Sequence, residues 1–197
     1  MNTICTEIDR LDKFMKDNLK ESRYIHSFGV EKVAVKLAKI YSVDTDKAAF
    51  AGRYHDIAKC FDEIRMNEYI EKYGIDKKYL NDTALAHSKV AAEILKNEFG
   101  VKDEDVLNAV RSHTTGRVDM SPLEEIVYVS DAIEENRNYP ELKMLQDLAE
   151  KDLDKTCLYI MDFAVQMIKE KGKEIDTETL DAREFMRARI RRNQDEQ

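Results

Sequence analysis

Four histidines stand out because they are the only ones in the 197-residue chain: His26, His55, His87 and His113. Each lies near the middle or the end of a predicted helix, among apolar neighbours. A lone histidine in such a place is more often a hydrogen-bonded core residue than a ligand. Four of them on four helices can be brought together by packing around one core, and imidazole is the commonest metal ligand among side chains.

Two aspartates interrupt apolar helical stretches. Asp56 follows His55 directly within residues 51–59, and Asp131 lies within residues 126–133. A carboxylate is costly to bury unless it is paired or bound to a metal. Asp131 could instead cap a backbone group or pair with an arginine. A shared site explains both aspartates better, with two imidazoles and two carboxylates around one divalent ion: His26, His55, Asp56 and Asp131. Such ligands suit iron, manganese, zinc or cobalt.

The elements that must position these residues are helices throughout. Helical periodicity runs almost end to end, without strand alternation, so the sequence predicts an all-α fold. Asp62 and Gly74 indicate the two ends of one helix, and Ser121-Pro122 with Glu124 indicates the start of another. We expect helices over residues 4–19, 28–41, 44–58, 62–73, 82–99, 103–112, 121–136, from 140 onward, 153–169 and 177–192.

Composition and charge limit the classes of partner. The formal net charge is −8, from 32 basic and 40 acidic side chains, which argues against broad nucleic-acid binding. A small anion could still bind near local cations, for which the candidates are Arg53, Lys59, Arg111, Arg117 and Arg137. No apolar run is long enough to span a membrane, and the first residues do not form a signal peptide. The scattered cysteines fit a reducing compartment. We therefore expect a soluble cytoplasmic protein, and a homodimer would be compatible with such a helical chain.

The order of these residues resembles the HD-domain metal-dependent phosphohydrolase superfamily, which is named after a His-Asp pair such as His55-Asp56. Within it the sequence is most similar to the bacterial YqeK-like symmetrical bis(5′-nucleosyl)-tetraphosphatases. The specific part is His113-Thr114-Thr115-Gly116 with the following Met120-Ser121. The resemblance also covers Tyr24 to Val30, Ala86-His87, and Ser130 to Glu134 with Arg137, and it extends over roughly Tyr24 to Arg183.

The resemblance implies a single HD-domain helical bundle over residues 1–197, with a core at about 22–140 and additional C-terminal helices over 140–192. It also implies an iron-type metal held by His26, His55, Asp56 and Asp131, with manganese, cobalt or zinc as alternatives. Predicted catalytic residues are Asp56, His87 and His113. Predicted substrate contacts are His26, His87, His113, Thr114, Asp131 and Arg137. The resemblance leaves open whether His87 and His113 bind a second metal instead.

The implied reaction is the symmetrical cleavage of diadenosine tetraphosphate, by attack of metal-bound hydroxide on an inner phosphate, to give two ADP. The chain would then be a bis(5′-nucleosyl)-tetraphosphatase, an acid-anhydride hydrolase with a small-molecule nucleotide substrate. Two alternatives remain. One is another HD phosphohydrolase acting on a (d)NTP, a nucleoside monophosphate or an alarmone. The other is a metal-stabilised module for partner binding. Residues 175–183 lack the His-Pro that the family often carries but keep Arg183, so the sequence leaves open whether this segment contacts the nucleotide.

Overall fold

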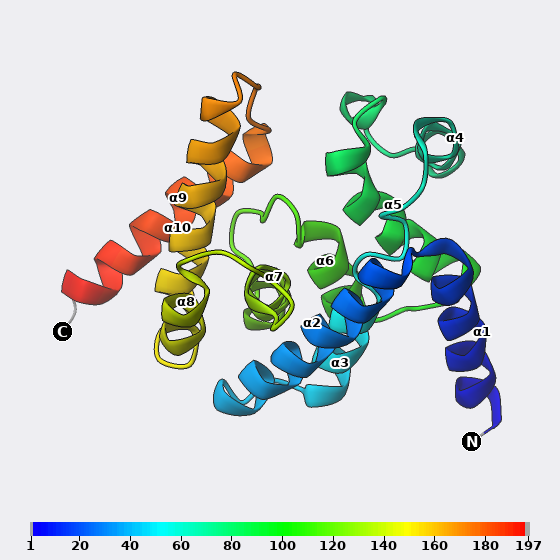
Figure 1. Ribbon diagram of the computed structural model, residues 1–197, viewed down its shortest axis with the longest axis horizontal. Coiled ribbons are helices and arrows are strands. Elements are labelled where there is room, and N and C mark those ends of the chain that lie inside the picture. Colours follow the sequence, from blue (N-terminus) through cyan, green and yellow to red (C-terminus); the bar gives the residue numbers. More distant parts are fainter. Residues whose placement is uncertain (1, 196–197) are drawn as a thin grey trace.

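The computed structural model describes residues 2–195, with side chains from Ile8 onward. Within these residues all regular elements are helical, as predicted (Figure 1). The α-helices are α1 (Asn2–Asn18), α2 (Glu21–Ile40), α3 (Thr45–Tyr54), α4 (Glu63–Tyr73), α5 (Thr83–Glu98), α6 (Glu104–Ser112), α7 (Pro122–Ile133), α8 (Leu142–Ala149), α9 (Leu153–Glu170) and α10 (Thr177–Asp195), and a short 3-10 helix, η1 (Lys77–Tyr79), precedes α5.

The centre of the molecule is formed by α2, α3, α6 and α7, which pack against one another (Figure 1). Helix α7 is buried along most of its length, and α2 and α3 approach each other closely at Gly52. A Cβ at Gly52 would lie only 3.0 Å from the Cα of Glu31 in α2, so any larger residue would press the two helix backbones apart by a few tenths of an ångström. The close approach brings the end of α3, where His55 follows, alongside the first half of α2, which carries His26.

Capping residues fix the helix ends where the sequence predicted them. The Asp62 carboxylate accepts a hydrogen bond from the backbone N–H of Arg65, and Gly74 ends α4 with a φ of 65°. At α7, Ser121 and Glu124 form a complete capping box, with Pro122 in the first turn. Both helices therefore begin at the positions that local hydrogen bonding favours.

Some predicted boundaries were wrong. Helix α3 ends at Tyr54, and residues 55–60 form turns, although Ile57 and Ala58 are buried as a helical pattern would require. Helix α7 ends at Ile133 rather than near residue 136, and α8 begins at Leu142 rather than at Pro140. Helix η1 was not predicted.

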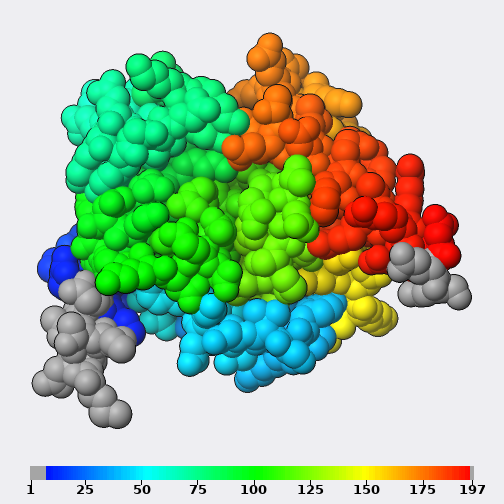
Figure 2. Space-filling view, turned by 180° about the vertical axis from the view of Figure 1, so that it is seen from behind, coloured from blue at the N-terminus to red at the C-terminus, as the bar shows by residue number. Residues whose placement is uncertain are grey.

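Two outer groups of helices meet on the back of the molecule. One consists of α4, η1 and α5, the other of α9 and α10, and they lie side by side in Figure 2 where teal meets orange. Glu178 at the start of α10 joins them. Its carboxylate accepts hydrogen bonds from Lys89 Nζ at 2.6 Å, Tyr79 Oη at 2.8 Å and Thr115 Oγ1 at 3.1 Å. Among the described residues, no helix could cross a membrane.

Candidate metal centre

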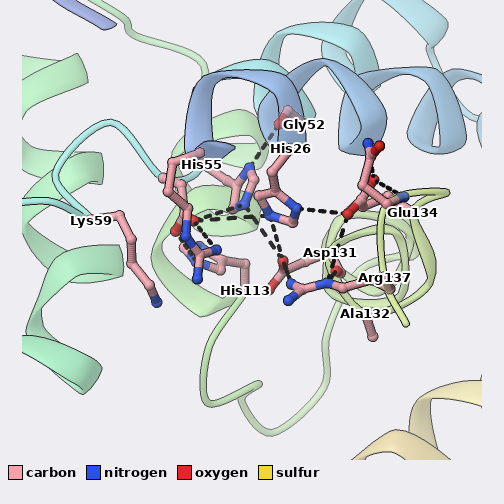
Figure 3. A network of polar contacts seen from close by, with 12 residues as sticks. His26, Gly52, His55, Lys59, His113, Asp131, Ala132, Glu134 and Arg137 are labelled. Carbon is pink, nitrogen blue, oxygen red and sulfur yellow. Dashed lines mark hydrogen bonds and ion pairs between the residues drawn. The ribbon is translucent and has the colours of Figure 1, made fainter. Parts of the chain in front are cut away.

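The predicted ligands come from five separate elements and meet in the centre of the molecule (Figure 3). His26 lies in α2, His87 in α5 and Asp131 near the end of α7. His55 and His113 each follow the last residue of a helix, α3 and α6. The four histidines and Asp56 are buried, and the Asp131 side chain is 25% exposed.

His26, His55, Asp56 and Asp131 form the first group. His26 Nε2 lies 3.0 Å from Asp131 Oδ1 and 4.0 Å from Asp56 Oδ2. His55 Nε2 lies 3.6 Å from Asp56 Oδ2 and 3.8 Å from Asp131 Oδ1. The structure thus brings together the four residues that the sequence grouped around one ion.

His87 and His113 form a second group on the other oxygen of Asp56. Their Nε2 atoms lie 3.2 Å and 3.3 Å from Asp56 Oδ1, and 3.1 Å from each other. Asp56 therefore stands between the two groups, with Oδ2 toward one pair of imidazoles and Oδ1 toward the other.

Hydrogen bonds on the far side of each ring orient the imidazoles. The Nδ1 atoms of His55, His113 and His87 lie 2.7 Å, 2.8 Å and 3.3 Å from the carbonyl oxygens of Gly52, Val110 and Thr83. A carbonyl only accepts, so each of these Nδ1 atoms donates. His26 Nδ1 lies 3.1 Å from the carboxylate of the buried Glu134. Every ring therefore points its Nε2 atom inward, in the arrangement typical of metal-ligating histidines.

The donor atoms fit a divalent cation. His26 Nε2, His55 Nε2 and Asp56 Oδ1 are buried atoms without a hydrogen-bond partner. There are two sets of three candidate ligand residues, His26-His55-Asp131 and His55-Asp56-His113. Within each set, the ligand atoms all lie within 4.8 Å of one another. Unpaired buried polar atoms are unfavourable, and a cation between them would remove that cost. Imidazole nitrogen and carboxylate oxygen suit the first-row metals expected from the sequence.

The local electrostatics also favour metal binding. Burial lowers the pKa of His55 to about 4 against the opposing charge of Asp56, and burial likewise lowers the pKa of His87. Burial raises the pKa of Asp56, but His55, His113 and His87 outweigh it and hold that pKa well below its ordinary value. Burial also raises the pKa of Asp131, but the hydrogen bond to His26 outweighs burial and holds that pKa far below its usual range. His26 is the exception, because burial lowers its pKa but Asp131 and Glu134 raise it overall, which favours the protonated ring that would lose its proton on binding a metal. Neutral imidazoles and ionised carboxylates are the forms that bind metal.

Each of the two groups has a cation beside it, Lys59 at the second and Arg137 at the first. Lys59 Nζ lies 3.0 Å from His87 Nε2, and Thr114 Oγ1 lies 3.2 Å from the same atom. Arg137 donates from Nη2 to Asp131 Oδ1 at 2.5 Å and from Nε to the Asp131 carbonyl at 2.9 Å. The chain is acidic overall, but this part of it can attract an anion.

The other candidate cations lie elsewhere. Arg53 pairs with Glu31, Arg111 with Glu93, and Arg117 with Glu124. Of the five cations considered from the sequence, the structure places only Lys59 and Arg137 at the centre.

Two residues at the centre were missed by the sequence analysis. Arg23 Nη1 lies 3.2 Å from Asp56 Oδ2. Glu134 was named above only as the last residue of the segment Ser130 to Glu134. Its carboxylate lies 3.1 Å from His26 Nδ1 and orients that ring. Arg23 stands three residues before His26 and Glu134 three after Asp131, the spacing of neighbours on one helix face, and that was the available signal.

Comparisons with known proteins agree on one family. The model of the HD domain matches residues 23–136. A relative from Staphylococcus aureus, named bis(5′-nucleosyl)-tetraphosphatase, symmetrical, is 34% identical over 177 residues, covering 88% of this chain and 91% of its own. A relative of the same name from Bacillus subtilis is 35% identical, covering 84% and 89%. A crystal structure from Clostridium acetobutylicum, described as a predicted HD superfamily hydrolase involved in NAD metabolism, superposes with a TM-score of 0.88 at 36% identity, covering 92% of this chain and 97% of that one.

Proposed function

The chain belongs to the HD domain family, and from this premise we propose that it is a symmetrical bis(5′-nucleosyl)-tetraphosphatase. It hydrolyses diadenosine tetraphosphate to two ADP, the activity for which its relatives from Staphylococcus aureus and Bacillus subtilis are named. The observation that carries the proposal is the convergence of four inward-pointing Nε2 atoms on Asp56 and Asp131, next to the cations Lys59, Arg23 and Arg137.

We assign the metal to His26, His55, Asp56 and Asp131. When bound there, a divalent ion supplies Lewis acidity, which lowers the pKa of water and polarises phosphoryl oxygens. Iron is our first choice and manganese, cobalt and zinc are alternatives, because two imidazoles and two carboxylates suit all four. His87, His113 and Asp56 Oδ1 are the residues that could hold a second ion.

The remaining polar groups face the phosphates. Thr114 offers a hydrogen bond to a phosphate oxygen. His87 and His113 can donate one from Nε2 only as imidazolium ions, because their Nδ1–H groups bind carbonyls. Lys59 and Arg137 neutralise the phosphate charge. Phosphoryl transfer depends mainly on such positioning and charge stabilisation. Attack of water on an inner phosphorus forms one P–O bond and breaks the bond to the central bridging oxygen, so each half leaves as ADP. The Nδ1–H of His113 donates to Val110, which leaves its Nε2 atom free to accept a proton from the water.

The experiment that tests this function compares substrates on the purified protein with Mn²⁺ or Fe²⁺. Diadenosine tetraphosphate, GTP and dGTP are offered in parallel, and the products are separated by ion-exchange chromatography. We expect ADP as the sole product of the first and little turnover of the others. ATP plus AMP, or no turnover with either metal, would contradict the proposal. His55→Ala and Asp56→Ala should both lose bound metal and activity, and Glu135→Gln, at an exposed position, should lose neither.

We also propose that the enzyme works in the cytoplasm on a small-molecule nucleotide, without nucleic acid or membrane as a partner. The net charge of −8 and the free thiols of Cys60 and Cys157 support this. A homodimer stays a prediction from the sequence.

A further inference from the structure

A cavity of about 200 Å³ lies next to the metal centre, between the end of α7, the start of α8 and the middle of α9. Most of its wall is apolar, from residues such as Ala132, Leu145 and Ile160, and three aromatic side chains line it, Tyr139, Tyr159 and Phe163. Pockets for whole drug-sized ligands usually measure about 300–1,000 Å³. This cavity therefore suits one part of a ligand rather than an entire nucleotide.

Two of the three aromatic residues are exposed. Tyr159 is 39% exposed and Phe163 is 47% exposed, and they stand one helical turn apart on α9. The third, Tyr139, is fixed, because its hydroxyl donates to the carbonyl of Ala132 at 2.7 Å. The cavity lining thus combines one aromatic side chain held by a hydrogen bond with two aromatic side chains that still contact water, and a flat ligand could cover these two.

Arg137 connects this cavity to the metal centre. Its side chain lines the cavity, and its guanidinium binds Asp131 on the other side. Figure 3 shows Arg137 and Ala132 at the edge of the polar network. Those two bonds engage two of the five guanidinium donors. The others can hold a phosphate whose nucleoside extends into the cavity.

A nucleobase matches these walls. Every base has a flat π-face that stacks on aromatic side chains, and Glu141 at the rim offers a carboxylate that can accept a hydrogen bond from an exocyclic amino group. We propose that this cavity is a nucleoside subsite, in which the base of one ADP half packs against Tyr159 and Phe163 while Arg137 holds its phosphate. The proposal rests on the proposed function, because that function supplies the nucleotide.

Binding of products tests the subsite directly. The dissociation constants of ADP and of inorganic pyrophosphate are measured by calorimetry with Mn²⁺ present, for the wild type, Phe163→Ala and Tyr159→Ala. We expect each alanine variant to weaken ADP about tenfold, because stacking of a base on one ring contributes about that much. Pyrophosphate has no base, so its affinity should stay within about twofold of the wild type.

Two further variants sharpen the test. Phe163→Trp keeps an aromatic face and should bind ADP nearly as well as the wild type. Ile64→Ala removes an exposed apolar side chain of α4, 74% exposed, and should change neither constant. Unchanged ADP affinity in both alanine variants, or equal weakening of ADP and pyrophosphate, would overturn the subsite. So would a wild type that does not bind ADP.

The two proposals fail in different ways. A protein that binds ADP through Phe163 and Tyr159 but does not cleave diadenosine tetraphosphate keeps the subsite and loses the proposed function. A protein that cleaves it normally after both substitutions, with unchanged ADP affinity, keeps the function and loses the subsite.

Discussion

Asp56 connects the two groups of histidines, since each of its oxygens faces a different pair of imidazoles. Arg23 also reaches Oδ2. A buried carboxylate with this many neighbours is held ionised without a direct lysine partner. Its substitution should therefore disturb both groups, whereas substitution of His87 should leave the proposed ligands of the first group in place.

Glu134 gives a prediction about metal affinity. Glu134→Gln removes the negative charge that His26 Nδ1 faces, and loss of such an orienting partner typically costs about 10- to 100-fold in metal affinity or activity. We expect Mn²⁺ to bind more weakly by that factor in a titration followed by electron paramagnetic resonance. Glu135→Gln is the matched control, because this neighbour is exposed and pairs with Lys32. Equal affinities in the two variants would contradict the role of Glu134.

Lys59 gives a prediction about turnover. Lys59→Met removes a cation 3.0 Å from His87 Nε2 but keeps the apolar stem. We expect kcat for diadenosine tetraphosphate to fall by about a hundredfold, the usual cost of removing one group that stabilises developing charge. Lys39→Met, at an exposed position of α2, should retain kcat. A Lys59→Met enzyme within threefold of the wild type would remove Lys59 from the phosphate site.

The sequence located the histidines and aspartates but not all of their partners. His55, Asp56 and Asp131 stand out because polar residues interrupt apolar stretches. Glu134 is 108 positions from His26 and Arg23 is 33 from Asp56, so nothing local marks these pairs. Only the packing of α2 against α3 and α7 brings them together.

At the scale of elements, the sequence predicted helix ends where a capping residue acts locally, through its side chain or, for glycine, through its left-handed backbone. Asp62, Gly74 and Ser121 act through bonds to residues within a few positions of themselves. The end of α3 was not predictable, because Ile57 and Ala58 continue the apolar pattern while the backbone already turns. That turn aims His55 and Asp56 at the centre, so the tertiary arrangement overrides the helical periodicity.

The capping box of α7 gives a prediction about stability. Ser121→Ala removes the acceptor for the backbone N–H of Glu124 at 3.4 Å, and loss of such a cap costs about 1 kcal/mol. We expect the midpoint of urea unfolding to fall by a corresponding amount, with an unchanged m-value. Ser22→Ala, exposed in the first turn of α2, is the control. A Ser121→Ala protein as stable as this control would show that Pro122 and Glu124 suffice.

At the scale of the whole molecule, Glu178 should make stability depend on pH. Burial raises its pKa, but Lys89 and Tyr79 outweigh burial and lower it to about 2. Because the folded-state pKa lies below the unfolded value of about 4.5, the stabilisation is present above pH 4.5 and is lost as the pH falls toward 2. The difference in unfolding free energy between wild type and Glu178→Gln should be larger at pH 6 than at pH 3. Glu174→Gln, an exposed neighbour, should follow the wild type at both values.

Metal removal should also change the stability of the whole chain. A ligand present at a hundred times its Kd, bound only by the folded state, raises the free energy of unfolding by about 2.7 kcal/mol. We expect this gain when Mn²⁺ is added to the metal-free wild type, and none for His55→Ala. A similar gain in both proteins would place the ion away from His55. The division into a core and additional C-terminal helices stays a prediction.

The hydrogen bond between Lys89 and Glu178 joins two residues that the ribosome adds at very different times. The two residues are 89 positions apart, and Glu178 also binds Thr115 in the loop after His113. At about 5–20 residues per second, a ribosome adds Glu178 roughly 4–18 s after Lys89. All four histidines have been synthesised long before that time. Thr115, two residues after His113, therefore forms its hydrogen bond to Glu178 only after a further 63 residues have been added to the growing chain.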